Sequence, residues 1–147
     1  ELFRGVERLL GMGTIWRRDF KDPRTYKLIG AAMAVHRNLG SGFLEAVYQE
    51  ALAKEFIRAA IPHERESPVA IKYDGETLAA IYRPDFVVYD NIIVELKTVG
   101  KIIEAHNRQV LHYLTATGYP LAILLNFGAD LLECRRFINT PGWRPQS

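Results

Sequence analysis

The chain has 147 residues, the length of one ordinary domain, which excludes a second catalytic domain. Hydrophobic residues make up 48% and charged residues 24%, so the composition excludes disordered, collagen-like and coiled-coil chains. The net charge is +2, far from the strongly basic balance of a protein that coats DNA without specificity.

The only cysteine, Cys134, limits the kinds of site that the chain can hold. An internal disulfide and a four-thiolate zinc or iron–sulfur site are excluded, so oxygen or imidazole ligands would hold any metal ion. No apolar run approaches the roughly 18 uncharged residues that cross a bilayer, and the first ten residues carry charges where a signal peptide needs an apolar core. We therefore expect a cytoplasmic protein without membrane contact.

The excess of basic over acidic residues lies in the N-terminal part of the chain. Residues 1–40 carry eight basic and four acidic side chains, whereas residues 41–147 carry eleven and thirteen. Residues 1–24 show no sustained periodicity, and we interpret them as a variable basic leader with one short helix from Leu2 to Leu10. A polyanion could bind to this positive charge, and a solvated surface explains the charge equally well.

Two helices are predicted after the leader. Apolar residues at helical spacing begin at Thr25, which we expect to be the N-cap, and Gly40 ends this first helix. A second apolar stripe begins near Ser41-Gly42 and stops before Pro62. The two segments predict a helical hairpin.

The next segment changes to the alternating pattern of strands. Asp74-Gly75 and Asp90-Asn91 are turn signals, and each separates two runs rich in β-forming residues. The predicted strands are Val69 to Tyr73, Thr77 to Tyr82, Asp85 to Tyr89 and Ile92 to Lys97. We expect these four strands to form an antiparallel meander.

A helix and two further strands are predicted to complete the domain. Helical spacing runs from Glu104 to Thr117 and is stopped by Gly118. Leu121 to Phe127 is a continuous apolar run, typical of a strand buried on both faces, and Leu131 to Ile138 is the last strand. The remaining residues, 139–147, contain two prolines and a glycine and are expected to be frayed.

This order of elements predicts an α/β (α+β) domain over residues 25–138, with one mixed sheet flanked by helices. Ionisable residues within its apolar strands are the main anomaly, because an unpaired buried charge costs several kcal/mol. Asp85 opens one strand of the second hairpin, and Glu95 and Lys97 share one face of its partner.

The length of the loop between these strands decides where the acids lie. With the three-residue loop Tyr89-Asp90-Asn91, Asp85 lies opposite Glu95, with β-carbons roughly 5 Å apart. With a two-residue loop the two acids lie on opposite faces of the sheet. Paired carboxylates suit Mg²⁺ or Mn²⁺, and Lys97 could then orient a water or neutralise a phosphate oxygen. A cross-strand salt bridge to Lys97 explains the same residues equally well.

Two helical segments offer further candidates. Glu45 lies on the flank of the apolar stripe of the second helix, where it would lean over the sheet, although an acidic residue in a first turn also suits the helix dipole. Gln109 and Tyr113 are four residues apart on one helical face, which a partly exposed polar edge would also explain.

Together these segments resemble the PD-(D/E)XK nuclease superfamily. The motif reads Arg83-Pro84-Asp85, nine further residues, then Glu95-Leu96-Lys97. The pattern Gly42-x-x-Glu45-x-x-Tyr48 resembles the bacterial family named for its GxxExxY signature, and the likeness extends from about Tyr26 to Ile138.

The resemblance implies a restriction-endonuclease-like αβββαβ core with a site for Mg²⁺ or Mn²⁺. Asp85, Glu95 and the Leu96 carbonyl would bind the ion, and Glu45 would complete the shell directly or through water. Lys97 would position the nucleophile. Gln109 and Tyr113 would support the site and contact DNA.

We expect a metal-dependent nuclease that hydrolyses phosphodiester bonds in DNA. The alternative is a nucleic-acid-binding or protein-interaction module that keeps the fold and uses the site weakly or not at all. A sugar or peptide hydrolase fits less well, because a lysine beside the acids has no evident role there. Arg83, Lys101, Arg108 and the leader are candidates for phosphate contacts, although surface solvation also explains them, and a homodimer would suit cleavage of both strands.

Overall fold

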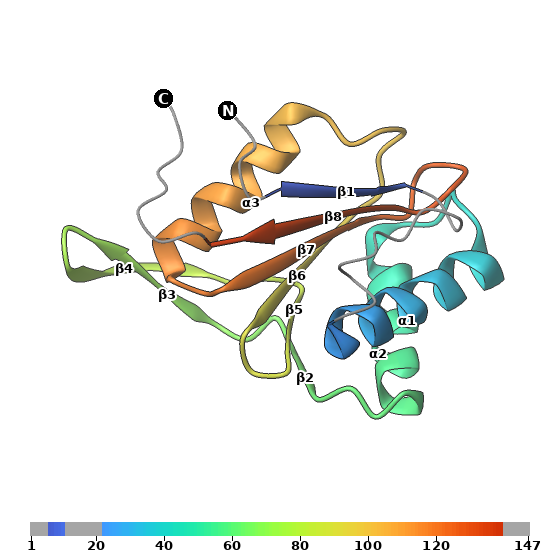
Figure 1. Cartoon of the computed structure of the whole chain (residues 1–147), viewed down its shortest axis with the longest axis horizontal. Helices are drawn as coiled ribbons and strands as arrows, with labels where there is room; N and C mark the ends of the chain where they lie inside the picture. The colour runs from blue at the N-terminus through green and yellow to red at the C-terminus, as the bar shows by residue number, and fades with distance from the viewer. Residues whose placement is uncertain (1–5, 11–21, 140–147) are drawn as a thin grey trace.

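The computed structural model describes residues 6–10 and 22–139, which form three helices and eight strands (Figure 1). In chain order these are β1 (Val6–Leu10), α1 (Pro23–Leu39), α2 (Glu45–Arg58), β2 (His63–Arg65), β3 (Val69–Tyr73), β4 (Glu76–Tyr82), β5 (Phe86–Val88), β6 (Ile92–Lys97), α3 (Glu104–Thr117), β7 (Leu121–Asn126) and β8 (Glu133–Ile138). None of the helices in this part of the chain has the length and apolar character needed to span a membrane.

A mixed sheet forms the centre of the fold. Its strand order is β1-β8-β7-β6-β5-β2, and β6 and β7 are parallel while all other neighbours are antiparallel. The parallel pair is joined through α3, the crossover that parallel strands require. The predicted fold class, a mixed sheet flanked by helices, is confirmed.

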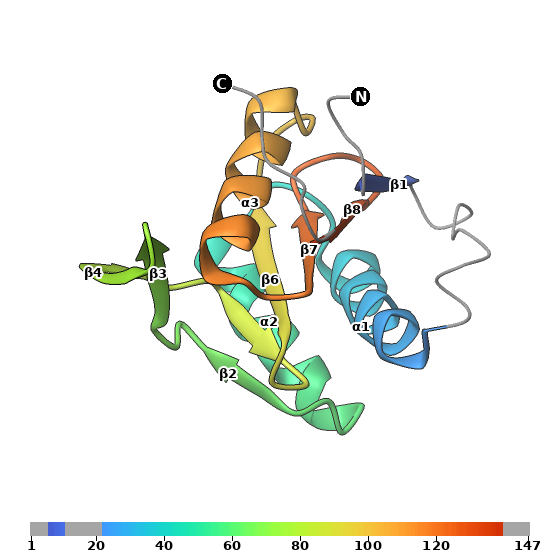
Figure 2. The same cartoon turned by 60° about the vertical axis from the view of Figure 1, so that its left-hand side comes forward.

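The sheet separates two hydrophobic cores. On one face α1 and α2 pack through residues such as Leu28 and Leu52, and on the other face α3 packs through Val110 and Leu114 (Figure 2). Along the central strands, side chains pack alternately into one core and the other, and all six residues of β7 are buried. The apolar run that begins at Leu121 therefore forms the strand covered on both faces that its sequence predicts.

Helix α3 has the predicted bounds, whereas α1 and α2 begin at different residues from those predicted. Asp22, not Thr25, caps α1, because its Oδ1 accepts from the N–H of Thr25 and Pro23 occupies the first helical turn. Thr25 is fully buried. The second helix begins at Glu45: Gly42 has a φ of 112°, outside the helical range, and the N-cap residue Leu44 is extended.

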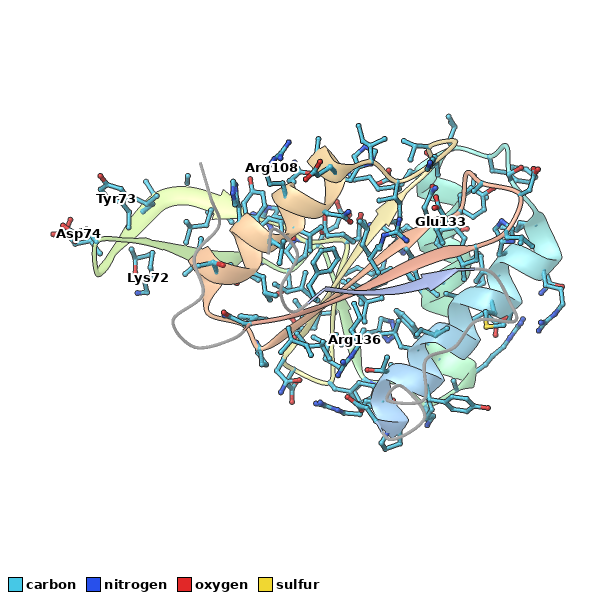
Figure 3. The ribbon with its side chains drawn as sticks, turned by 45° about the horizontal axis from the view of Figure 1, so that its top comes forward. Lys72, Tyr73, Asp74, Arg108, Glu133 and Arg136 are labelled. Carbon is cyan, nitrogen blue, oxygen red and sulfur yellow. The ribbon has the colours of Figure 1, made fainter. Side chains whose placement is uncertain are left out.

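The predicted single meander is wrong. Strands β3 and β4 form a separate two-stranded sheet that projects from the body, and the short β2 pairs with β5 instead. Figure 3 shows Lys72, Tyr73 and Asp74 at the far end of this hairpin. The turn at Asp74-Gly75 is confirmed, with φ values of 52° and 81°. With three residues, β2 is too short for periodicity to reveal it.

The helix predicted over the leader is also wrong where the structure describes it. Val6–Leu10 is β1, which pairs antiparallel with β8, and a segment as short as the predicted one is only marginally stable as an isolated helix. The rest of the predicted leader, apart from 22–24, lies outside the described residues. The tail prediction fails at Asn139, whose side chain donates to the carbonyls of Leu114 and Tyr119, while residues 140–147 lie outside the described part.

Candidate active site

The hairpin of β5 and β6 has the three-residue loop. Val88 pairs with Ile92, and Tyr89 and Asp90 adopt φ values of 50° and 68° in the loop. Phe86 pairs with Val94, so the next position places Asp85 beside Glu95. The backbone N–H of Asp85 donates to Glu95 Oε1 at 3.0 Å. The two-residue alternative, with the acids on opposite faces, is excluded.

The carboxylate of Asp85 is held by two donors. Leu96 N–H donates to Oδ2 at 2.8 Å, and Gln49 Nε2 donates to Oδ1 at 3.0 Å. Burial raises the pKa of Asp85, the charge of Glu66 adds to the rise, and both hydrogen bonds oppose it. The carboxylate is therefore fixed in direction and costly to ionise without a counter-charge.

Glu95 carries the largest pKa shift among the acidic groups around the site. Burial and the charge of Asp85 raise its pKa to about 7. The hydrogen bonds that Glu95 accepts from the Asp85 N–H and from Tyr82, together with the charge of Lys97, lower the pKa by less than this rise. Two neighbouring acids in such surroundings call for a cation or a proton between them. Within the described residues, however, no three His, Cys, Asp or Glu side chains already form a group that could hold a metal ion.

Glu45 lies on α2 and faces Asp85. With Ala46, Gln49, Glu66 and Asp85 it lines a pocket of about 270 Å³. Burial and the charge of Asp85 raise the pKa of Glu45, and Lys97 lowers it. As predicted, Glu45 lies over the end of the sheet at Asp85, although its side chain remains solvent-exposed.

Helix α3 supplies the opposite side of the site. Lys97 Nζ donates to Gln109 Oε1 at 3.4 Å, and no ion pair within 4.0 Å joins Lys97 to Asp85 or Glu95 in the described chain, so the salt-bridge explanation fails. Tyr113 stacks on Tyr82 with centroids 4.0 Å apart. Gln109 therefore contacts β6 through Lys97, whereas Tyr113 contacts Tyr82 on β4, whose hydroxyl hydrogen-bonds Glu95.

The three candidate phosphate contacts are spread around the site. All are exposed, and Arg83 donates to the carbonyl of Glu66 at 3.2 Å, close to Asp85. Lys101 lies in the loop before α3, and Arg108 lies on α3 (Figure 3). No hydrogen bond joins either of these two to the acidic side chains in the described part of the chain.

Sequence reasoning missed four residues around the acids. Gln49 and Arg65 form a hydrogen bond at 2.8 Å, and Glu66 lies beside Asp85 with a φ of 49°. Tyr82 hydrogen-bonds Glu95, and its pKa is raised well above the ordinary value by burial and by the charge of Glu95. Only Gln49 had a readable signal, since it lies four residues after Glu45 on one helical face.

Two residues of the pattern Gly42-x-x-Glu45-x-x-Tyr48 have structural roles. Tyr48 is fully buried, its ring stacks on Phe127 at 4.8 Å, and its hydroxyl donates to the Gly40 carbonyl and accepts from Phe43 N–H. Gly42 provides the left-handed backbone before the helix. These two residues hold the loop that leads into α2, and the glutamate of the pattern shares a pocket with Asp85.

Comparison with known families assigns the chain to a superfamily. The family model described as the PD-(D/E)XK nuclease superfamily matches residues 22–137. Comparisons with curated proteins and with solved structures each found no match. The matched range covers most of the chain and includes Asp85, Glu95 and Lys97, so the chain belongs to the PD-(D/E)XK nuclease superfamily.

Proposed function

We propose that the chain is a metal-dependent nuclease that hydrolyses phosphodiester bonds in DNA. The observation that carries this proposal is the pairing of Asp85 with Glu95 in a half-buried position where both pKa values are raised. Membership of a nuclease superfamily supports the reaction class.

The oxygen donors suit a hard divalent cation. Mg²⁺ commonly takes one or two carboxylates and fills its other positions with water and substrate phosphate. Asp85 and Glu95 would supply these carboxylates, and Glu45 would reach the ion directly or through water.

The Leu96 carbonyl would be a further ligand. The Leu96 N–H donates to Asp85 at the edge of β6 that faces β5. The Lys97 carbonyl accepts from the Phe127 N–H at 2.9 Å, at the edge that faces β7. Because successive residues of a strand turn their backbone groups to opposite edges, the Leu96 carbonyl leaves β6 on the side of Asp85.

The cation and the side chains around the acids would have different roles in catalysis. A bound Mg²⁺ or Mn²⁺ would act as a Lewis acid for the phosphate and lower the pKa of a bound water. The Lys97 ammonium, held by Gln109, would orient the attacking water and neutralise charge on a phosphate oxygen. Tyr113 would support this arrangement through its stack on Tyr82 and contact DNA.

Cationic side chains outside the acidic centre would bind the substrate backbone. We place Arg83, Lys101 and Arg108 in this role because all three are exposed and belong to the segments that carry Asp85, Lys97 and Gln109. We further propose that the protein belongs to the GxxExxY family, acts in the cytoplasm, and forms a homodimer when it cuts both strands.

Metal-dependent cleavage tests the proposal. Linear, circular, branched and single-stranded DNA, with RNA for comparison, would be incubated across Mg²⁺ and Mn²⁺ series. Asp85→Asn and Lys97→Met should each lower the cleavage rate at least about a hundredfold. Asp90→Asn removes the same charge as the first variant from the exposed loop of the same hairpin and should cleave like the wild type.

The second candidate is a binding module on the same fold. It is favoured by the lack, within the described residues, of a preformed group of three metal-binding side chains. Such a module would bind DNA with equal affinity in the wild type, Asp85→Asn and Lys97→Met and would release no product with either cation. Cleavage by the wild type that both variants lose would exclude it.

A further inference from the structure

A buried glutamine connects Asp85 to an arginine on the neighbouring strand β2. Gln49 lies on α2, one helical turn after Glu45, and is only 8% exposed. Its Nε2 donates to Asp85 Oδ1 at 3.0 Å, and its Oε1 accepts from the guanidinium of Arg65 on β2 at 2.8 Å. Side chains from β2, α2 and the start of β5 thus form one chain of hydrogen bonds.

Arg65 decides which end of the Gln49 amide faces Asp85. A guanidinium has donors only, so it can bond the amide oxygen but not the amide nitrogen. The nitrogen must then point to Asp85, where it meets an acceptor. In the reversed amide, donor would face donor and oxygen would face carboxylate, so both contacts would repel. The chemistry of the three groups therefore allows one orientation.

The carboxylate of Asp85 receives one donor on each oxygen. The strand supplies the Leu96 N–H at Oδ2, and the helix supplies the Gln49 amide at Oδ1. An ionised carboxylate has about four lone-pair sites, so roughly two remain open after these bonds are made. Since the two donors come from different elements, they prevent the carboxyl group from rotating and give the open lone pairs a constant direction.

We propose that Gln49, oriented by Arg65, is a positioning residue that holds the Asp85 carboxylate in the orientation that binds the divalent cation. This role rests on the proposed function. Without Gln49 the carboxylate can rotate, so cation binding must also order the side chain. Groups that orient a metal ligand typically change metal affinity about 10- to 100-fold. Gln49 acts through Asp85, so it changes cation affinity and not the rate of the chemical step.

Gln49→Met tests the role because methionine keeps the length and burial of the side chain and loses both hydrogen bonds. Cation binding is measured without DNA, from the Mg²⁺-dependent rise in unfolding temperature and from Mn²⁺ titration followed by electron paramagnetic resonance. The dissociation constant should rise about tenfold or more. The kcat at saturating Mg²⁺ should stay within about twofold of the wild type, which separates positioning from catalysis.

Arg65→Met tests the same hydrogen-bond chain from an exposed position and so leaves the buried packing intact. It should also weaken cation binding. In the Gln49→Met background it should cause no further loss of cation affinity, because both substitutions break the same chain of hydrogen bonds. Arg58→Met removes an equal charge from an exposed ion pair with Glu55 and should bind the cation like the wild type.

The outcomes separate the two proposals. If the wild type binds Mg²⁺ and cleaves DNA while Gln49→Met binds Mg²⁺ equally well, the positioning role is overturned and the nuclease stands. Effects of Gln49→Met and Arg65→Met that add in full would also overturn the role, because they would show independent actions. A wild type that binds neither cation would overturn both the nuclease and the positioning role.

Discussion

Glu95 should make the metal-free protein less stable as the pH rises. Burial and the charge of Asp85 raise its pKa from 4.5 to about 7 in the folded chain. A carboxyl group whose pKa is higher in the folded state stabilises the fold at low pH, and this contribution disappears as the pH rises through the folded value. One pKa unit is about 1.4 kcal/mol, so Glu95 should lower the free energy of unfolding by about 3 kcal/mol between about pH 4.5 and pH 8.

Glu95→Gln isolates this effect. Glutamine cannot ionise, and its amide oxygen can still accept the Asp85 N–H that Glu95 Oε1 accepts at 3.0 Å. Urea unfolding in EDTA, repeated across this pH range, measures the stability of both proteins. The variant should be more stable than the wild type at about pH 8, by up to about 3 kcal/mol, and the difference should shrink toward about pH 5.

Mg²⁺ provides the matching control. At about pH 8 a saturating concentration should raise the stability of the wild type and have a much smaller effect on Glu95→Gln, because the cation compensates the ionised pair. Asp85 and Glu45 have pKa values raised by burial and so contribute in the same direction. Parallel stability profiles for the wild type and Glu95→Gln would refute the reasoning.

Three other substitutions test the neighbourhood of the site. Tyr82→Phe removes the hydroxyl that lowers the pKa of Glu95, so the pH midpoint of Mg²⁺ binding should move upward; an unchanged midpoint in a pH-dependent Mg²⁺ titration would contradict this. Tyr48→Phe removes the hydroxyl that holds the loop at Gly40 and should cost about 1–3 kcal/mol in urea unfolding, whereas wild-type stability would show that water replaces it. Gly128→Ala would bring a β-carbon to 2.5 Å from the backbone that follows β6, so it should lose about 1–3 kcal/mol or more; unchanged stability would show that this loop can shift freely.

The sequence limited the two strand acids to two placements, because local chemistry fixes the alternation of side chains, and the loop length seen in the structure decides between them. A strand has a side-chain period of two, so once the loop at Tyr89 has three residues, Asp85 must lie beside Glu95. The apolar run of β7 and the glycine that ends α3 are local signals of the same kind. Such signals act over a few residues and are visible in the sequence.

The errors arose where distant contacts decide the structure. Val6–Leu10 has no strong strand pattern of its own and becomes β1 because it pairs with the edge of β8. The β3 and β4 hairpin leaves the main sheet because β2 takes the position beside β5. Gln49 and Arg65 lie far from Asp85 in the sequence, so only the folded chain shows that they share a hydrogen-bond chain.

The position of a bound Mn²⁺ ion would show whether Asp85 and Glu95 share one cation. Crystals grown with Mn²⁺ would be measured at a wavelength where manganese scatters anomalously. We expect a peak within roughly 2.0–2.3 Å of carboxylate oxygens of both Asp85 and Glu95, with the Leu96 carbonyl as a further ligand. A peak that contacts only one of these acids, or no peak near them at a saturating concentration, would contradict this expectation.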